Sequence, residues 1–148
     1  MIQTILVPTD GSPHAEKAVS FAGELARLYG AKIILLHALP DTIYERIPEA
    51  YRELAHAEHM PIGDALISVS EEIVRCAKKR LRELGLKEVT IATPRGPAPQ
   101  AILDYIKEHP VDMVVMGSRG LSDLEGMMLG SVSHKVSHLA PCSCLVVR

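Results

Sequence analysis

The chain has 148 residues, of which 47% are hydrophobic and 23% charged, values that predict one globular domain over residues 1–148 and exclude a mainly disordered chain. Its formal net charge is −2, only 3% of its residues are aromatic and its pI is about 6.4, so the basic surface and stacking residues of a nucleic-acid-binding protein are not expected. No apolar run approaches the ~18 residues that span a membrane, so we expect neither a membrane-spanning segment nor a membrane as partner.

The first half of the chain predicts two strands and a helix, followed by a less regular segment. Residues 2–7 form a strand that ends at Pro8, and Ser12 and Pro13 supply the N-cap and first position of a helix. This helix ends at Gly30, and its apolar stripe contains Ala15, Ala18, Val19, Ala22, Leu25, Ala26 and Tyr29. Residues 32–38 are apolar nearly throughout, which is typical of a parallel strand covered on both faces. Residues 39–63 are less regular, with room for a short helix between 49 and 59.

The second half alternates helices and strands. Residues 64–84 predict an amphipathic helix whose apolar face contains Leu66, Val69, Ile73, Cys76, Ala77, Leu81 and Leu84. A strand over residues 89–92 and a turn over 94–97 lead to a helix that ends before Pro110. A strand follows at 113–116, and after a loop comes a fourth helix with Leu129, Val132, Val136 and Leu139 inward. The last strand covers residues 144–147.

This order of elements predicts the fold class and the place of the site. Five strands that alternate with four main helices predict an α/β fold, a parallel sheet with helices on both faces. Ligands on such sheets bind outside the carboxyl ends of the strands, where the strand order reverses. The loops at that edge are residues 8–12, 38–41, 93–97 and 117–130.

The loop after the fourth strand carries the strongest functional signal. Glycines at 117, 120 and 130 allow backbone N–H groups to approach an anion closely. Ser131 follows at the start of a helix, where free N–H groups and the positive end of the helix dipole converge. The hydroxyls of Ser131 and Ser133 and the guanidinium of Arg119 add donors that suit a di- or triphosphate. A flexible glycine-rich loop that binds nothing is the alternative, and the loop is neither a Walker A sequence nor a dinucleotide fingerprint.

These residues resemble a known family. The spacing Gly117-x2-Gly120-x9-Gly130-Ser131 is similar to the G-2x-G-9x-G-(S/T) motif of the nucleotide-binding branch of the universal stress protein (UspA-like) family. Residues 5–12, 35–38, 112–120 and 140–147 are similar to further family segments and occur in the same order, so the resemblance covers the whole chain.

The resemblance implies a Rossmann-like fold, similar to that of adenine nucleotide alpha hydrolases, with a five-stranded sheet in the order 3-2-1-4-5. It also implies ATP as ligand, with Mg²⁺ or Mn²⁺. Asp10 would lie near the ribose or the phosphate-bound metal ion, and Ala38 would meet adenine through its backbone. The other residues that would line the cleft or hold ribose and phosphates are Pro8, Thr9, Gly117, Ser118, Arg119, Gly120, Leu121, Ser122, Asp123, Gly130, Ser131, Val132 and Ser133. The last strand, residues 144–147, would join two copies into a homodimer.

Several polar residues have a second interpretation. Asp10 would coordinate a metal ion that bridges phosphates, or would only form a turn ahead of Ser12. The pairs His56 with His59 and His134 with His138 lie at helical spacing, but transition-metal binding needs further ligands, and a solvated helix face is the simpler interpretation.

The cysteines and the start of the chain predict a cytoplasmic protein. Three cysteines are too few, and odd in number, for a disulfide framework, which favours a reducing compartment. Residues 1–4 lack the basic region of a signal peptide. Cys142 and Cys144 share one face of a strand, where a metal or redox role competes with that of small hydrophobic residues.

We therefore expect an ATP-binding, nucleotide-responsive stress or signalling module with slow or absent hydrolysis, because neither a G-x-S-x-G elbow nor an H-E-x-x-H motif occurs. One alternative is a slow metal-dependent ATPase or a nucleotidyl or phosphoryl transferase, in which Asp10 and Asp123 orient a water. The other is a dimeric interaction module that binds no nucleotide. A phosphorelay receiver is set aside, because Asp10 stands alone and residues 89–93 contain no Asp.

Overall fold

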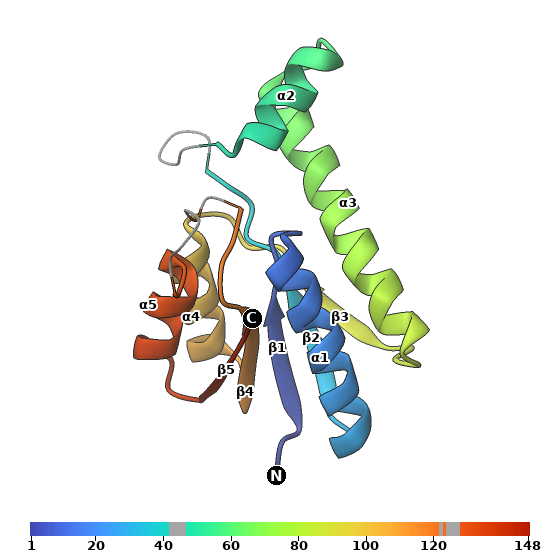
Figure 1. Ribbon diagram of the computed structural model, residues 1–148, viewed down its shortest axis with the longest axis vertical. Helices are drawn as coiled ribbons and strands as arrows, with labels where there is room; N and C mark the ends of the chain where they lie inside the picture. The colour runs from blue at the N-terminus through green and yellow to red at the C-terminus, as the bar shows by residue number, and fades with distance from the viewer. Residues whose placement is uncertain (42–46, 122, 124–127) are drawn as a thin grey trace.

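The computed structural model describes residues 1–41, 47–121, 123 and 128–148. Over these residues the chain forms five strands and five helices (Figure 1), with two helices in the second connection between strands and one in each of the others, which confirms the predicted α/β class. The elements are β1 Thr4–Pro8, α1 Pro13–Tyr29, β2 Lys32–Leu36, α2 Glu49–Ala57, α3 Ile62–Glu83, β3 Val89–Ala92, α4 Ala98–Glu108, β4 Met113–Gly117, α5 Ser131–Leu139 and β5 Ser143–Val147. The prediction of a single domain over residues 1–148 stays a prediction.

The strands form one parallel sheet in the order β3-β2-β1-β4-β5, which confirms the predicted order. β1 is the central strand, with Ile5 opposite Ile33 of β2 on one side and opposite Met113 of β4 on the other. The chain passes from β1 to β2 in one direction and later returns to place β4 on the other side of β1. The carboxyl ends of β1 and β4 therefore flank the point where the strand order reverses.

Alternation along the strands divides the core into two layers. Ile5 and Val7 of β1 face a cluster that also holds Ala22 of α1 and Leu81 of α3. Leu6, between them, faces the opposite cluster, which contains residues of α4 and α5. Helices α1 and α3 thus cover one face of the sheet, and α4 and α5 cover the other (Figure 1), as expected for apolar strands buried on both sides.

Helix α1 begins and ends at the residues that its capping signals predict. The hydroxyl of Ser12 accepts a hydrogen bond from the backbone N–H of Ala15 at 3.3 Å, and Pro13 occupies the first turn. Gly30 closes the helix in the left-handed conformation, with φ at 66°. Tyr29 is the one wrong member of the predicted buried stripe, because it lies in the last turn and 49% of its surface is exposed.

Three further predictions are wrong in detail. β2 ends at Leu36, so His37 and Ala38 lie beyond the strand. Cys76 is exposed, because its side chain turns toward Glu72, to which Sγ donates a hydrogen bond at 3.2 Å. The last helix begins at Ser131, after Gly130 as its N-cap residue, so Leu129 lies outside it, and Leu139 in its final turn is 54% exposed.

Helices α2 and α3 form an arm that rises past the carboxyl edge of the sheet (Figure 1). α2 lies within the segment expected to hold a short helix, and α3 begins at Ile62, two residues before the predicted start. Tyr51 of α2 is buried, with 2% of its surface exposed. The arm therefore brings α2 close to the carboxyl edge of the sheet, where the sequence predicts the site. Among the described residues, no helix is both long and apolar enough to cross a membrane.

Candidate functional site

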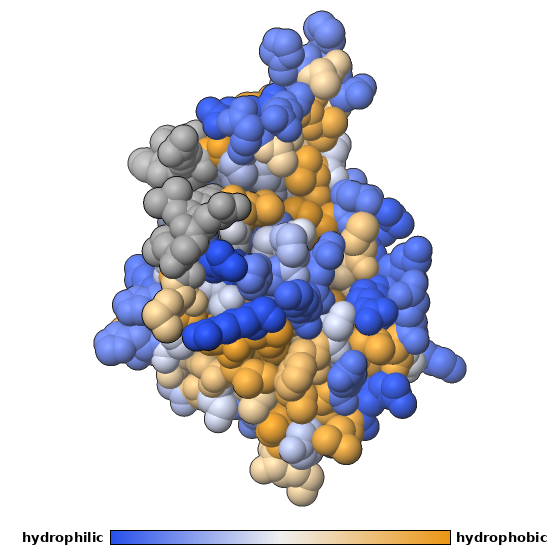
Figure 2. Space-filling view, viewed as in Figure 1, coloured by the Kyte–Doolittle hydropathy of each residue, from blue (hydrophilic) through white to orange (hydrophobic). Residues whose placement is uncertain are grey.

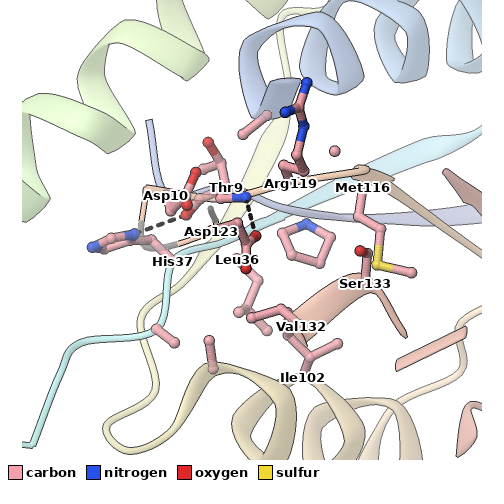
Figure 3. A pocket seen from close by; sticks show the side chains of 16 residues that line it. Thr9, Asp10, Leu36, His37, Ile102, Met116, Arg119, Asp123, Val132 and Ser133 are labelled. Carbon is pink, nitrogen blue, oxygen red and sulfur yellow. Dashed lines mark hydrogen bonds between the residues drawn. The ribbon is translucent and has the colours of Figure 1, made fainter. Parts of the chain in front are cut away.

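A cleft lies at the carboxyl ends of β1 and β4, where the sequence predicts the site (Figure 3). Its polar side is formed by the loops after β1 and β4, and its apolar side by Leu36, Ile102, Met116 and Val132. Ten of the residues expected to hold a ligand line it: Pro8, Thr9, Asp10, Ala38, Gly117, Arg119, Gly120, Asp123, Val132 and Ser133. The loops after two strands and the start of α5 thus converge on one space.

His37 connects the loop after β1 to helix α3. Its Nδ1 donates to the carbonyl oxygen of Thr9 at 2.8 Å, because a carbonyl can only accept, and its Nε2 lies 3.0 Å from the hydroxyl of Ser70. In the neutral ring Nε2 accepts the Ser70 proton. Burial lowers the pKa of His37, against the opposing effects of the Thr9 carbonyl and the charge of Asp10. The cleft wall therefore contains a neutral imidazole that fixes the backbone of Thr9.

The carboxylate of Asp10 holds two loops together. Oδ1 accepts from the backbone N–H of Ser12 at 2.9 Å, which is the turn-forming role considered from the sequence. Oδ2 accepts from the backbone N–H of Leu121 at 2.8 Å, across from β1 to the loop after β4. A Cβ on Gly120 would lie 2.6 Å from Oδ2, so a side chain at 120 would push this carboxylate away. Asp10 thus forms the turn and also faces the cleft.

The carboxylate of Asp123 occupies the start of α5. It accepts from the backbone N–H of Gly120 at 2.5 Å and from that of Ser131 at 3.2 Å. A Cβ on Gly130 would collide with Oδ2 of Asp123. The two N–H groups and the missing Cβ atoms of residues 120 and 130 together form a small cradle, which we call the Gly120–Ser131 cradle. Because a carboxylate already sits in it, the cradle has the geometry and polarity to hold an anion.

Gly117 leaves no room for a side chain, and the reason is packing between β4 and α1 and not the cradle. A Cβ at this position would lie 2.7 Å from the carbonyl carbon of His14 and 2.8 Å from the backbone nitrogen of Ala15, at the start of α1. Neither atom belongs to a flexible side chain, so the contact cannot be relieved by a change of rotamer. The first glycine of the motif therefore allows β4 and α1 to pack closely, whether or not a ligand is bound.

Other expected ligand residues make contacts within the protein. The guanidinium Nη2 of Arg119 donates to Nε2 of His14 at 3.3 Å, and Figure 3 shows this side chain directed away from His37 and Ile102. The hydroxyl of Ser133 donates to the Ser118 carbonyl at 2.9 Å, and Ser118 is buried with 1% of its surface exposed. Ser122 lies outside the described residues. The ligand roles of these residues stay predictions.

The cleft extends beneath α2. This extension shares Asp10, His37 and Ala38 with the cleft and adds other residues, including Pro40, Pro48, Tyr51, Leu121 and Ser131. Burial raises the pKa of Tyr51, and a hydrogen bond with Ser70 acts in the opposite direction. The sequence did not single out His37, Ile102, Met116 or Tyr51 as site residues. The expected strand over residues 32–38 included His37, so its position in the loop after β2 could not be predicted from the sequence.

The other titratable pairs do not gather into a metal site. His56, His59, His134 and His138 are exposed, and the rings of His134 and His138 stack with their centroids 6.4 Å apart. Cys142 and Cys144 are free and half-buried. Within the described part of the chain, no three His, Cys, Asp or Glu residues are arranged to hold a metal ion.

Comparison with known proteins gives consistent matches over the whole length. The model of the universal stress protein family matches residues 1–148. Universal stress protein YxiE of Bacillus subtilis is 36% identical to this chain over 151 residues, and the alignment covers all of both chains.

Two solved structures are similar over nearly the whole chain. Universal stress protein UspA from Lactobacillus plantarum superposes with a TM-score of 0.80 at 25% identity, covering 99% of this chain and 98% of that one. A universal stress protein in complex with cAMP superposes with a TM-score of 0.72 at 28% identity, covering 99% and 97%. The cleft of this chain can therefore be compared with that of a protein that has been solved with an adenine nucleotide.

Proposed function

This chain belongs to the universal stress protein family, and we propose that it binds an adenine nucleotide, ATP in particular, in the cleft between β1 and β4. The observation that carries the proposal is the Gly120–Ser131 cradle, whose N–H groups already hold a carboxylate and which a side chain at 130 would fill. The similar protein in complex with cAMP supports an adenine nucleotide as the ligand class.

The two sides of the cleft suit the two ends of such a ligand. The apolar side chains of Ile102, Met116 and Val132 offer a surface for a base, and the backbone of Ala38 lies at the same wall. The phosphates would lie at the Gly120–Ser131 cradle, where N–H groups and the dipole of α5 favour negative charge. Arg119 would add its positive charge after leaving His14.

The polar residues also suit a phosphate-bound cation. Mg²⁺ and Mn²⁺ prefer oxygen ligands and are usually held by one or two carboxylates together with substrate phosphates. Asp10 supplies a carboxylate within the cleft, and each of its oxygens accepts one N–H bond and so retains a free lone pair. When bound, the ion would neutralise part of the phosphate charge, and Asp10 would help to orient it.

We propose slow or absent hydrolysis, which makes the protein a nucleotide-responsive module rather than an efficient enzyme. A general base needs a proton-accepting atom free to face the attacking water. Both ring nitrogens of His37 are engaged, by Thr9 and Ser70, so this imidazole has no acceptor atom free for a water. The alternative, a slow metal-dependent ATPase or transferase, predicts metal-dependent turnover that is lost in Asp10→Ala.

We further propose a homodimer formed through β5. This strand lies at the edge of the sheet, and Leu145 and Val147 on it are only half-buried. Figure 2 shows hydrophobic surface over the region where β5 and α1 lie in Figure 1. An exposed apolar edge strand is a template for pairing with another chain, and a second copy would cover it. The cytoplasmic location stays a prediction from cysteine usage.

Calorimetric titration of ATP with Mg²⁺ tests the nucleotide proposal, after a denatured sample has been checked for co-purified nucleotide. We expect saturable binding to the wild type and at least tenfold weaker binding to Gly130→Val, which fills the cradle. Gly63→Val is the matched control, because a Cβ at position 63 meets no atom within 4 Å. Absence of binding to a nucleotide-free wild-type protein would contradict the proposal and favour the dimeric interaction module.

A further inference from the structure

The Gly120–Ser131 cradle is filled by part of the chain itself. Asp123 spans it, with one carboxylate oxygen on the Gly120 N–H at 2.5 Å and the other on the Ser131 N–H at 3.2 Å. Oδ2 takes up the space next to Gly130 that a Cβ would need. A phosphate that used these same N–H groups would require the space and the donors that the carboxylate now takes.

The carboxylate of Asp123 and a bound phosphate would also repel each other. Asp123 lies on the wall of the cleft together with Asp10, so the described residues place two carboxylates beside the proposed phosphate position. Arg119 is the nearby cation among the lining residues, and its guanidinium contacts His14. Like charges at close range disfavour binding, and the effect is larger in a partly enclosed site than in water.

We propose that Asp123 is an internal competitor of the nucleotide phosphates and so weakens the binding of ligands that carry phosphate charge. The inference rests on the proposed function and adds its regulation. A ligand with a polyphosphate chain and its bound cation compensates for the displaced carboxylate. A nucleoside without phosphate leaves Asp123 in place and gains nothing from the cradle.

The competing explanation is a purely structural role. Gly130 is the N-cap residue of α5 and has no side chain for the free N–H groups, so Asp123 also serves as a cap supplied from eight residues before Ser131. A cap alone predicts that removing its charge lowers stability and leaves or weakens nucleotide binding. An internal competitor predicts that the same change strengthens the binding of polyphosphates.

The test compares adenosine, AMP and ATP by calorimetry, with Mg²⁺ present, on the wild type and on Asp123→Asn. The amide keeps the shape and one acceptor oxygen but loses the charge. We expect ATP to bind Asp123→Asn about tenfold more tightly, as expected when one charge-assisted contact no longer has to be broken. Adenosine should bind both proteins equally, and AMP should show a smaller gain than ATP.

The matched control is Asp112→Asn, because Asp112 is also a carboxylate that accepts two backbone N–H bonds, from Gln3 and Thr4. Asp112 lies just before β4, at the amino ends of the strands, whereas the cleft lies at their carboxyl ends. Its replacement by Asn changes the net charge by the same amount. Its ATP affinity should equal that of the wild type. If Asp123→Asn unfolds, Asp123→Ala and a titration with inorganic tripolyphosphate take its place.

Equal or weaker ATP binding by the Asp123 variant would overturn this inference and leave the proposed function intact. An equal gain in Asp112→Asn would also overturn it, since the effect would then come from net charge alone. A complete lack of ATP binding by wild type and variants would overturn the proposed function and this inference with it.

Discussion

At the scale of single residues, the polar side chains of the cleft are held by backbone groups. Asp10 and Asp123 accept backbone N–H bonds, and His37 donates to a backbone carbonyl. The contacts of Asp10 and His37 fix these two side chains before any ligand arrives, which reduces the ordering required on binding. The glycines of the motif contribute by the atoms that they lack, and each of the three faces a different neighbour: His14, Asp10 or Asp123.

The burial of His37 makes stability depend on pH. Its pKa is lowered in the folded state from the ordinary value of 6.5, so below that pH the unfolded chain binds more protons than the folded one. The free energy of unfolding therefore falls as the pH is lowered from about 7.5 to about 5.5, by at most about 1.4 kcal/mol per pH unit from this group. Urea denaturation at several pH values across this range gives the free energy of unfolding as a function of pH. This free energy should depend less steeply on pH in His37→Gln than in the wild type. The exposed His138→Gln is the control, and an unchanged slope in His37→Gln would refute the expectation.

The close packing at Gly117 predicts a loss of stability without any ligand. A Cβ there would meet the backbone of His14 and Ala15 at 2.7 and 2.8 Å, and overpacking of this kind costs about 1–3 kcal/mol. Gly117→Ala should therefore lower the melting temperature. Gly63→Ala, in the open first turn of α3, should leave stability unchanged or raise it by about 0.4–1 kcal/mol. A melting temperature of Gly117→Ala equal to that of the wild type would show that β4 and α1 can separate at no cost.

At the scale of elements, the sequence predicted both ends of α1, which local interactions determine. Ser12, Pro13 and Gly30 set both ends of α1, because capping depends on neighbours within four residues. The alternation of elements predicted a parallel sheet, and the strand order was implied by the family resemblance. Residues 39–63 were less predictable, because the burial of Tyr51 on α2 depends on the arm made with α3. The contact of Asp123 with Ser131 closes a loop, and no spacing rule predicts which acceptor fills such a cradle.

Helix α3 is attached to the sheet through its second half. Leu81 is fully buried in the layer beneath α1, and its side chain lies against Gly23. Leu81→Ala should lower the free energy of unfolding by about 2–5 kcal/mol, the usual cost of a large-to-small change in a core. Leu28→Ala, at a side chain that is 76% exposed on α1, should change it by less than about 0.5 kcal/mol. Equal effects in chemical denaturation would mean that α3 is not part of the cooperative core.

At the scale of the whole molecule, the fold separates the proposed ligand site from the proposed interface. The cleft opens at the carboxyl ends of β1 and β4, whereas β5 forms an outer edge of the sheet. The backbone N–H of Ser118 donates to the carbonyl of Val147 at 2.7 Å, so the loop after β4 is tied to the end of the edge strand. A dimer interface at β5 would therefore be connected to the glycine-rich loop through this hydrogen bond.

The edge strand predicts the oligomeric state. Leu145→Lys places a charge on β5, and we expect the mass in light scattering after gel filtration to fall from that of a dimer to that of a monomer. Thr90→Lys, on the opposite edge strand β3, should leave the mass unchanged. Circular dichroism shows whether both variants fold. A wild-type protein that is monomeric at all concentrations would contradict the proposed interface.

Mapping of the ligand on the ¹⁵N-labelled protein by NMR shows whether a nucleotide binds at the Gly120–Ser131 cradle. Titration with ATP and Mg²⁺ should produce saturable shifts of the backbone amide signals of Gly120 and Ser131, together with those of Asp10 and Ala38 around the cleft. Shifts confined to the groove between α1 and α3, around Cys76 and Arg80, or no saturable shift at all, would contradict nucleotide binding at the cradle.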